Sequence, residues 1–321
     1  MCILVATTKH PDYPLILLSN RDEYFKRPTR PAHFRPLDSS SKILSPADLG
    51  RSENGTWIGI TTTGKIAVLL NYREDDNKNS FSEISRGILP LEYLCGKSSD
   101  DDWFHHIKLP NEGKIDLSRI GGFSLVFGKL NIDPGTTKID HLNIISNRGD
   151  HGKILGTNQV HGEPCNDLHD DIYSKKTFGI SNSLYYNPWR KVKLGEDMVD
   201  ELMERTTTES LSKHELIEEC FKILSTDTYN REIYQCNDFD IKFKELRNSI
   251  FIPPLDTGKP EQDSSKTVGR YYGTRTQTVI ILDKHGTIDY FERNLHNSDD
   301  IETDRSFNQH FSFKVPQPSR Y

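Results

Sequence analysis

The feature that most constrains this chain is the cysteine at position 2, directly before a short apolar run. Its side chain is small, so we expect Met1 to be removed and Cys2 to become the N-terminus. Such a residue carries a thiol and a free α-amine on one Cα. The amine titrates near pH 8, so a neutral fraction can act as a base for the thiol. A nearby cation would favour the thiolate. The start of the chain therefore predicts a nucleophile-type site.

Two apolar runs at the start of the chain predict a β-hairpin. Cys2–Thr7 and Leu15–Asn20 are rich in branched residues and flank a polar loop that contains Pro11. Both runs are apolar on both faces, which suits strands in the centre of a covered sheet. Folding about Pro11 sets Cys2 opposite Asn20.

The hairpin brings the polar quartet Asn20-Arg21-Asp22-Glu23 to the same end of the sheet as Cys2. We expect Arg21 to lower the pKa of the thiol and Asp22 to orient the α-amine or a substrate amide. The alternative interpretation is a core cysteine, because cysteine is among the most buried residue types.

The rest of the chain shows further hairpins and a minority of helices. A capping box at Ser212–Glu215 opens one helix, Ile84, Ile88, Leu91 and Leu94 mark another, and a third covers Glu196–Met203. Because strands and helices do not alternate as βαβ units, the pattern favours an α+β fold with layered sheets. The predicted strands are Thr56–Thr61, Lys65–Asn71, Phe123–Phe127, Leu142–Ser146, Thr177–Ser181, Thr274–Leu282 and Thr287–Arg293.

We expect one domain over residues 1–295. We expect the polar insertions at 74–80 and 253–266 to be loops and residues 296–321 to be a flexible tail.

The formal charge of −6 without a basic face argues against nucleic acid as a partner. The longest apolar runs have strand length, which predicts no transmembrane segment. Five widely spaced cysteines, an odd number, argue against a disulfide framework, so we expect a reduced, cytoplasmic protein.

Two groups of histidines are candidates for metal ligands. His105-His106 lacks a second ligand pair at helical spacing, and the chain has no C-x-x-C, so no metal site is predicted there. His161, Cys165 and His169 lie close together and would suit a haem iron. A polar loop with scattered histidines is the interpretation that we favour.

Six short motifs in a fixed order resemble the NRDE-motif family, also called the transport and Golgi organisation 2 family. The match runs from residue 1 to about residue 293. The motifs are Met1-Cys2, Ser19-Asn20-Arg21-Asp22-Glu23, Asn54-Gly55-Thr56-Trp57, Leu70-Asn71-Tyr72-Arg73, Gly179-Ile180-Ser181-Asn182 with Pro188-Trp189, and Tyr272-Gly273-Thr274-Arg275.

The resemblance implies a four-layer αββα sandwich similar to the N-terminal-nucleophile hydrolases. It also implies a catalytic set, carried over as Cys2, Arg21, Asp22, Asn71, Asn182 and Arg275. An amide such as that of Asn182 would donate to an oxyanion. In the hydrolases the arginine and the aspartate are separated, whereas Arg21 and Asp22 are adjacent. Adjacent strand residues point to opposite faces, so both reach Cys2 only if the strand has already ended.

Two functions remain open, one implied by the resemblance and one supported by the local chemistry around Cys2. The first is an intracellular ligand handler, connected with haem trafficking, acyl-CoA and lipid homeostasis, Golgi organisation and secretion. It would bind an amphipathic anionic ligand, haem, acyl-CoA or lipid, with transient membrane-surface contact and Golgi or mitochondrial association. The second is a cysteine amidohydrolase or acyltransferase acting on C–N or thioester bonds. The residues expected to bind the ligand are Asn20, Arg21, Glu23, Tyr72, Trp189 and Arg275.

Overall fold

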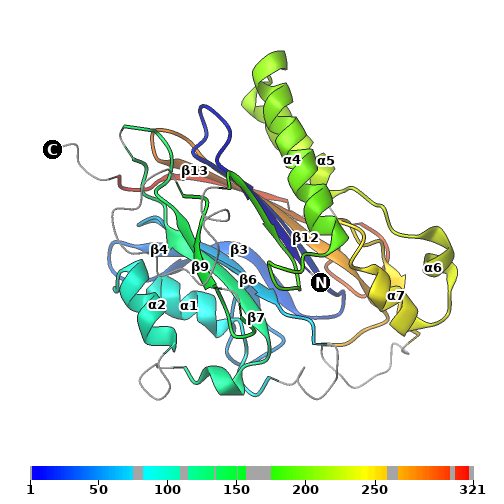
Figure 1. The fold of residues 1–321 in the computed structure, drawn as a ribbon. Coiled ribbons are helices and arrows are strands. Elements are labelled where there is room, and N and C mark those ends of the chain that lie inside the picture. The colour runs from blue at the N-terminus through cyan, green and yellow to red at the C-terminus, as the bar shows by residue number, and fades with distance from the viewer. Residues whose placement is uncertain are drawn as a thin grey trace.

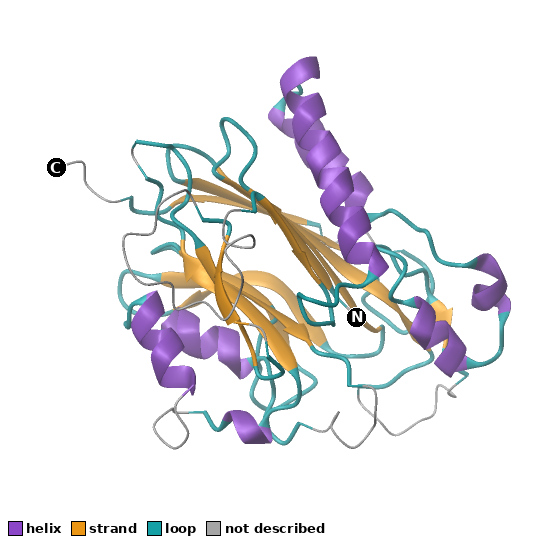
Figure 2. Cartoon of the chain, viewed as in Figure 1, coloured by secondary structure: helices purple, strands orange, loops and turns teal. Residues whose placement is uncertain are grey.

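Two antiparallel β-sheets face each other and helices cover their outer faces (Figures 1 and 2). The computed structural model describes residues 2–74, 82–108, 115–133, 135–149, 151–156, 175–258, 267–303 and 308–317. Within them, each sheet has seven strands. The predicted α+β class and the four-layer αββα order are therefore confirmed.

The first sheet contains the N-terminal hairpin at its centre. Its order is β10 (Thr177–Ile180), β1 (Ile3–Thr7), β2 (Leu15–Tyr24), β12 (Tyr271–Leu282), β13 (Thr287–Asn294) and β14 (Gln309–Lys314), and the short β11 (Leu255–Asp256) also pairs with β12.

The second sheet is a meander in chain order. It consists of β3 (Thr29–Pro36), β4 (Lys42–Asp48), β5 (Ile58–Thr61), β6 (Lys65–Asn71), β7 (Phe123–Lys129), β8 (Leu142–Ser146) and β9 (His151–Ile154).

The helices form two outer layers. In Figure 1, α1 (Ile88–Cys95) and α2 (Asp100–Lys108) lie on the second sheet, while α4 (Arg190–Glu209) and α5 (Lys213–Leu224) lie on the first. The shorter α6 (Arg231–Gln235) and α7 (Phe239–Glu245) contribute to a separate apolar cluster around Tyr272 of β12, and a 3₁₀ turn covers Leu117–Arg119.

Strand alternation distributes the core over these layers. In β1, Leu4 and Ala6 join the cluster between the two sheets, whereas Ile3 and Val5 join the cluster beneath α4 and α5. Successive side chains of a strand point to opposite faces, so a strand apolar on both faces must be covered on both. Cys2 packs against the cluster between the sheets, on the same side as Leu4.

The predicted N-terminal hairpin is present with a register shifted by one residue. Ile3, rather than Cys2, lies opposite Asn20, and Thr7 lies opposite Ile16. The turn is therefore centred between Pro11 and Asp12 instead of at Pro11. One step further along this register, Cys2 comes level with Arg21.

Several predicted boundaries are wrong, and three of them matter for the architecture. The second strand continues to Tyr24 because it pairs with β12 along its whole length. The third helix begins at Arg190, directly after Pro188-Trp189, since Lys191 and Val192 continue its buried stripe. Residues 309–314, expected in a flexible tail, form β14 because β13 offers them a free edge.

The predicted loop at 253–266 is also interrupted, because Leu255–Asp256 forms β11. Residues 75–80 of the predicted insertion 74–80, and 259–266 of the second, lie outside the described residues. The division into one domain and a tail stays a prediction.

Candidate functional site

A cavity of about 380 Å³ opens between the two sheets at the end where β1 begins. Cys2, Arg21 and Glu23 line it from the first sheet, and Trp57 and Asn71 line it from the second. The hairpin therefore does bring Cys2 together with part of the predicted quartet. We call this space the Cys2 cavity.

Arg21 and Asp22 lie on opposite faces of β2, because the strand has not ended when it reaches them. The guanidinium of Arg21 lies 4.1 Å from the centre of the Trp57 ring, on the side of the cavity. It also lies 3.5 Å from the carboxylate of Glu23. Arg21 is 5% exposed, and its buried Nη1 has no hydrogen-bond partner among the described residues.

The carboxylate of Asp22 is held on the helix side of the strand, although Asp22 also borders the cavity. Thr274 Oγ1 donates to Asp22 Oδ1 at 2.8 Å, and Lys191 Nζ lies 3.6 Å from Oδ2. The side chains of Asp22 and Lys191 are both 0% exposed. Two buried charges of opposite sign stabilise each other where water cannot. Asp22 thus joins β2 to the start of α4.

The pKa of the Cys2 thiol lies above its ordinary value. Burial raises its pKa, and the nearby carboxylate of Asp22 acts in the same direction. The positive charge of the N-terminus, then Arg21 and the backbone N–H of Asp22, lower the pKa, but burial remains the largest influence. The expected activation of the thiol by Arg21 is therefore present and outweighed. The carbonyl of Cys2 accepts a hydrogen bond from Ser181 Oγ at 2.6 Å.

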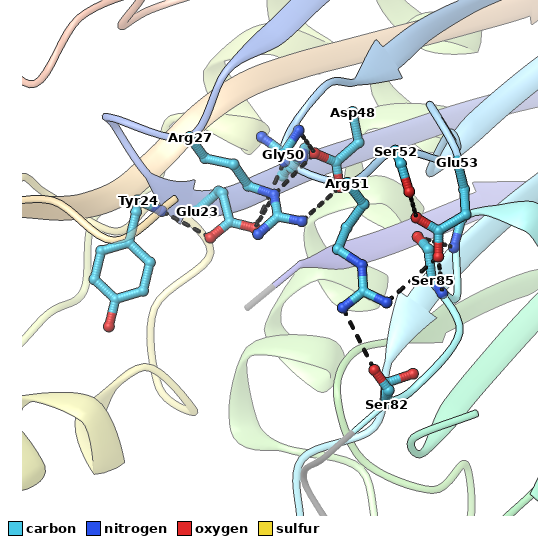
Figure 3. Close-up of polar contacts among 12 residues, drawn as sticks. Glu23, Tyr24, Arg27, Asp48, Gly50, Arg51, Ser52, Glu53, Ser82 and Ser85 are labelled. Carbon is cyan, nitrogen blue, oxygen red and sulfur yellow. Dashed lines mark hydrogen bonds and ion pairs between the residues drawn. The ribbon is translucent and has the colours of Figure 1, made fainter. Parts of the chain in front are cut away.

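The opposite wall of the cavity carries further arginines (Figure 3). Arg27 makes two hydrogen bonds with Asp48, at 2.9 and 2.8 Å. Arg51 donates to the carbonyl of Glu83 at 2.5 Å, and its Nη2 lies 3.4 Å from the carboxylate of Glu53. Arg27 lies in the turn between β2 and β3, Arg51 lies in the loop after β4, and Glu83 lies in the segment before α1.

The loop after β4 packs closely against the segment before α1, and this contact also places Arg86. A Cβ atom on Gly55 would lie 2.6 Å from the carbonyl carbon of Gly87, so glycine permits the loops to touch. The Arg86 side chain lines the cavity from this junction and donates to the carbonyl of Gly122 at 2.9 Å. Burial lowers the pKa of its guanidinium to about 10.

A second cavity, of about 100 Å³, collects three of the predicted residues away from Cys2. We call it the Asn182 cavity. Tyr72, Asn182 and Trp189 line it. Asn182 does not face Cys2, because its Nδ2 donates to the backbone carbonyl of Asn71. Of the two asparagines considered for an oxyanion site, Asn71 borders the Cys2 cavity and Asn182 lies behind it.

Arg275 and Asn20 lie apart from both cavities. Arg275 occupies a bulge in β12 and donates to the carbonyls of His296, at 2.8 Å, and of Arg27. Burial lowers its pKa to about 9. Asn20 is fully buried and donates to the carbonyls of Leu224 and Ile250 at 2.8 and 2.9 Å. Both side chains stabilise neighbouring backbone, and Arg275 also lines a separate cavity of about 360 Å³. The expected ligand contacts of these two residues stay a prediction.

The residues that sequence reasoning missed come from separate loops. Arg27, Arg51 and Arg86 have no common spacing, so no linear signal marks them. Lys191 could have been found from the buried stripe of α4, in which it precedes Gly195 and Val199 at intervals of four.

Other predictions concern metals, cysteines and membranes. Among the described residues no three His, Cys, Asp or Glu side chains are grouped to hold a metal, and no helix is long and apolar enough to cross a membrane. His105 and His106 lie exposed in α2. His161, Cys165 and His169 lie outside the described ranges.

Known proteins match this chain along nearly its whole length. Residues 1–297 match the family model described as Transport and Golgi organisation 2. A Saccharomyces cerevisiae protein described as uncharacterized is 33% identical over 317 residues, covering 94% of both chains.

A Bos taurus protein named Transport and Golgi organization protein 2 homolog is 30% identical, covering 89% of this chain and 88% of its own. Among solved structures, the C2A mutant of conjugated bile acid hydrolase from Clostridium perfringens aligns over 100% of this chain and 99% of its own. It has a TM-score of 0.39 and 11% identity.

Proposed function

Because the chain belongs to the transport and Golgi organisation 2 family, we propose that it handles an amphipathic ligand whose anionic head binds in the Cys2 cavity. The observation that supports this most directly is the set of arginines around the cavity, namely Arg21, Arg27, Arg51 and Arg86. Guanidinium groups match carboxylate and phosphate groups in geometry as well as in charge.

The four arginines outnumber the acidic residues that line the cavity, which are Asp22, Glu23 and Asp48. Of these, Glu23 lies 3.5 Å from Arg21. Asp48 is engaged by Arg27, and the carboxylate of Asp22 is engaged by Lys191 on the other side of β2. Arg21 keeps a buried Nη1 without a hydrogen-bond partner among the described residues. A buried donor without an acceptor is unfavourable, by about 1–3 kcal/mol, so an anion at this position would be stabilised.

The cavity also offers apolar surface next to the arginines. Trp57 and Leu69 line it together with Cys2. Its volume of about 380 Å³ lies at the lower end of the range for small-molecule sites, about 300–1,000 Å³. We infer that the polar head of acyl-CoA, or the propionate edge of haem, enters the cavity while the remainder of the ligand extends outside it.

The test is titration of the purified protein with palmitoyl-CoA and with haemin, followed by calorimetry and by absorbance. We expect saturable binding of at least one of them. Arg51→Gln should weaken it about tenfold, because a hydrogen bond to a charged group contributes about 1.5–3 kcal/mol. The matched control is Arg205→Gln on α4, where the side chain is 48% exposed and remote from the cavity.

Absence of binding for both ligands, in a protein with a normal unfolding transition, would refute the proposal. If wild type, Arg51→Gln and Arg205→Gln bind the ligand with equal affinity, the ligand does not bind in the Cys2 cavity. The family connection with haem trafficking, lipid homeostasis and Golgi organisation would then require another site.

Acyl transfer or amide hydrolysis at Cys2 is the second function. One observation favours it, because Cys2 borders the cavity together with Asn71 and Arg21. Against it stand the raised thiol pKa and the turn of the Asn182 amide toward Asn71. If the enzyme function holds, Cys2→Ser abolishes turnover of a panel of acyl amides and thioesters. Equal rates in the variant and the wild type would exclude it.

A further inference from the structure

The Asn182 cavity contains two buried polar atoms that the fold leaves without hydrogen-bond partners. Asn182 Oδ1 and Ser183 Oγ both have no partner among the described residues, although the two residues are only 3% and 7% exposed. Both residues line the cavity. Buried polar atoms are nearly always paired, so the two atoms in this small cavity offer hydrogen bonds to a group bound there.

The charge around the Asn182 cavity is positive. Arg73 and Arg247 line it, and none of its described lining residues is acidic. The Arg73 guanidinium lies 4.2 Å from the centre of the Phe243 ring and Arg247 lies 5.2 Å from that of Trp189, so both side chains are held by aromatic faces.

The N-terminus of α4 adds positive electrostatic potential to that of the two arginines. Trp189 is the N-cap of this 20-residue helix and also lines the cavity. The cap makes no side-chain hydrogen bond, and the first turn contains no acidic residue. The positive end of the helix dipole is therefore not neutralised by the helix's own side chains, which favours an anion nearby.

Size and hydrogen bonding narrow the ligand class. The cavity of about 100 Å³ is large enough for a group of roughly five non-hydrogen atoms. Asn182 Oδ1 is an acceptor, since the Nδ2 of the same amide already donates to the Asn71 carbonyl. The ligand must therefore present a donor as well as negative charge.

We propose that the Asn182 cavity binds a small oxyanion that carries a hydroxyl group, either hydrogen phosphate or a 2-hydroxy carboxylate. Its charge faces Arg73 and Arg247, and its hydroxyl donates to Asn182 Oδ1. Ser183 Oγ donates to one of its oxygens. This site is distinct from the Cys2 cavity, from which the hydrogen bond between Asn182 and Asn71 separates it.

The experiment uses two pairs of probes that differ in the hydroxyl group. Phosphate is compared with sulfate, and glycolate with acetate, by calorimetry on the full chain at neutral pH. The Arg51→Gln variant serves as background, because it weakens anion binding in the Cys2 cavity and leaves the Asn182 cavity intact. We expect the hydroxyl-bearing member of one pair to bind about tenfold tighter than its partner, since the partner leaves the acceptor unpaired.

Two substitutions then locate the site. In the same background, Ser183→Ala should weaken binding several-fold and Arg247→Gln at least about tenfold. Unchanged thermal unfolding of Ser183→Ala shows that the fold is intact, even if Arg247→Gln is destabilised. A crystal structure with the tighter probe should show it between Asn182 and Arg247.

Three results would overturn the proposal. The first is that no probe binds saturably at millimolar concentration. The second is that both members of each pair bind with equal affinity, and the third is that Ser183→Ala leaves the affinity unchanged. Each is independent of whether palmitoyl-CoA or haemin binds in the Cys2 cavity, so failure here and failure of the proposed function can be told apart.

Discussion

The two faces of the segment Asn20-Arg21-Asp22-Glu23 serve different purposes. On the helix side of β2, Asn20 and Asp22 are buried and bonded to fixed groups of the protein. On the other side, Arg21 and Glu23 border the Cys2 cavity. One strand thus supplies a structural anchor and a surface that lines the cavity from alternate residues.

The difference teaches that neighbours in a motif need not share a function. Had the strand ended before Arg21, all four side chains could have approached Cys2. Because pairing with β12 continues to Tyr24, the pleat separates them. The comparison predicts losses of stability on one face and losses of binding on the other.

The largest expected effect concerns Asp22. Asp22→Ala leaves the buried Lys191 without its carboxylate, so the free energy of unfolding should fall by about 3–5 kcal/mol. Urea denaturation measures this loss. The double variant Asp22→Leu with Lys191→Met should be much closer to wild type, because both charges are then removed. A single variant with an unchanged midpoint would show that the ion pair does not join β2 to α4.

The next effect concerns Asn20 on the same face. Asn20→Ala removes the donors to the carbonyls of Leu224 and Ile250, and we expect the free energy of unfolding to fall by about 2–3 kcal/mol. Glu23→Gln, on the cavity face, is the comparison variant and should lower stability by less, about 1 kcal/mol, because its ion pairs with Arg21 and Arg27 are partly exposed. Similar losses in both variants would remove the distinction between the faces.

Arg21 should show the reverse pattern. Arg21→Gln should reduce the affinity for the anionic ligand of the Cys2 cavity about tenfold. Its effect on stability should stay below about 1 kcal/mol, the contribution of a cation–π contact with Trp57. Calorimetry and urea denaturation on one protein preparation measure both quantities. A large loss of stability with unchanged affinity would assign Arg21 to the structural face.

The smallest effect concerns the reactivity of Cys2. Its thiol pKa is raised by burial, so the thiolate fraction at a given pH is lower than for an ordinary thiol and rises only at higher pH. Alkylation by iodoacetamide, followed by peptide mass spectrometry, should therefore be slow at neutral pH and accelerate as the pH rises. Intact mass also reports whether Met1 is removed.

Arg21 modifies this reactivity because its charge favours the thiolate. Arg21→Gln should slow alkylation a few-fold, and Arg21→Lys should restore it. Rapid alkylation of the wild type at neutral pH would contradict the raised pKa and would strengthen the enzyme alternative.

The elements of the fold were largely predictable where local pattern and burial agree. The hairpin of β1 and β2 and that of β12 and β13 follow from branched apolar runs around polar turns. Strand β14 was missed because Gln309–Lys314 alternates between exposed and half-buried positions at a sheet edge, where local hydrophobicity is weak.

The site was predictable only in part. Cys2 and Arg21 could be placed together because a hairpin is a local structure whose register nearly follows from sequence. Arg51, Arg86 and Lys191 reach the two sides of that site through contacts between segments far apart in the chain. No spacing in the sequence encodes such contacts, although the spacing within α4 does indicate that Lys191 is buried.

The sequence alone therefore determined a central N-terminal hairpin with Cys2 at its open end, because strand periodicity and turn residues act over short distances. The tertiary structure decided which side chains face the cavity, since this depends on the length of β2 and on its pairing with β12. It also decided that Arg275 and Asn20 stabilise backbone and that Asn182 borders a cavity of its own. These outcomes depend on bulges, burial and long-range packing, which the order of residues does not express.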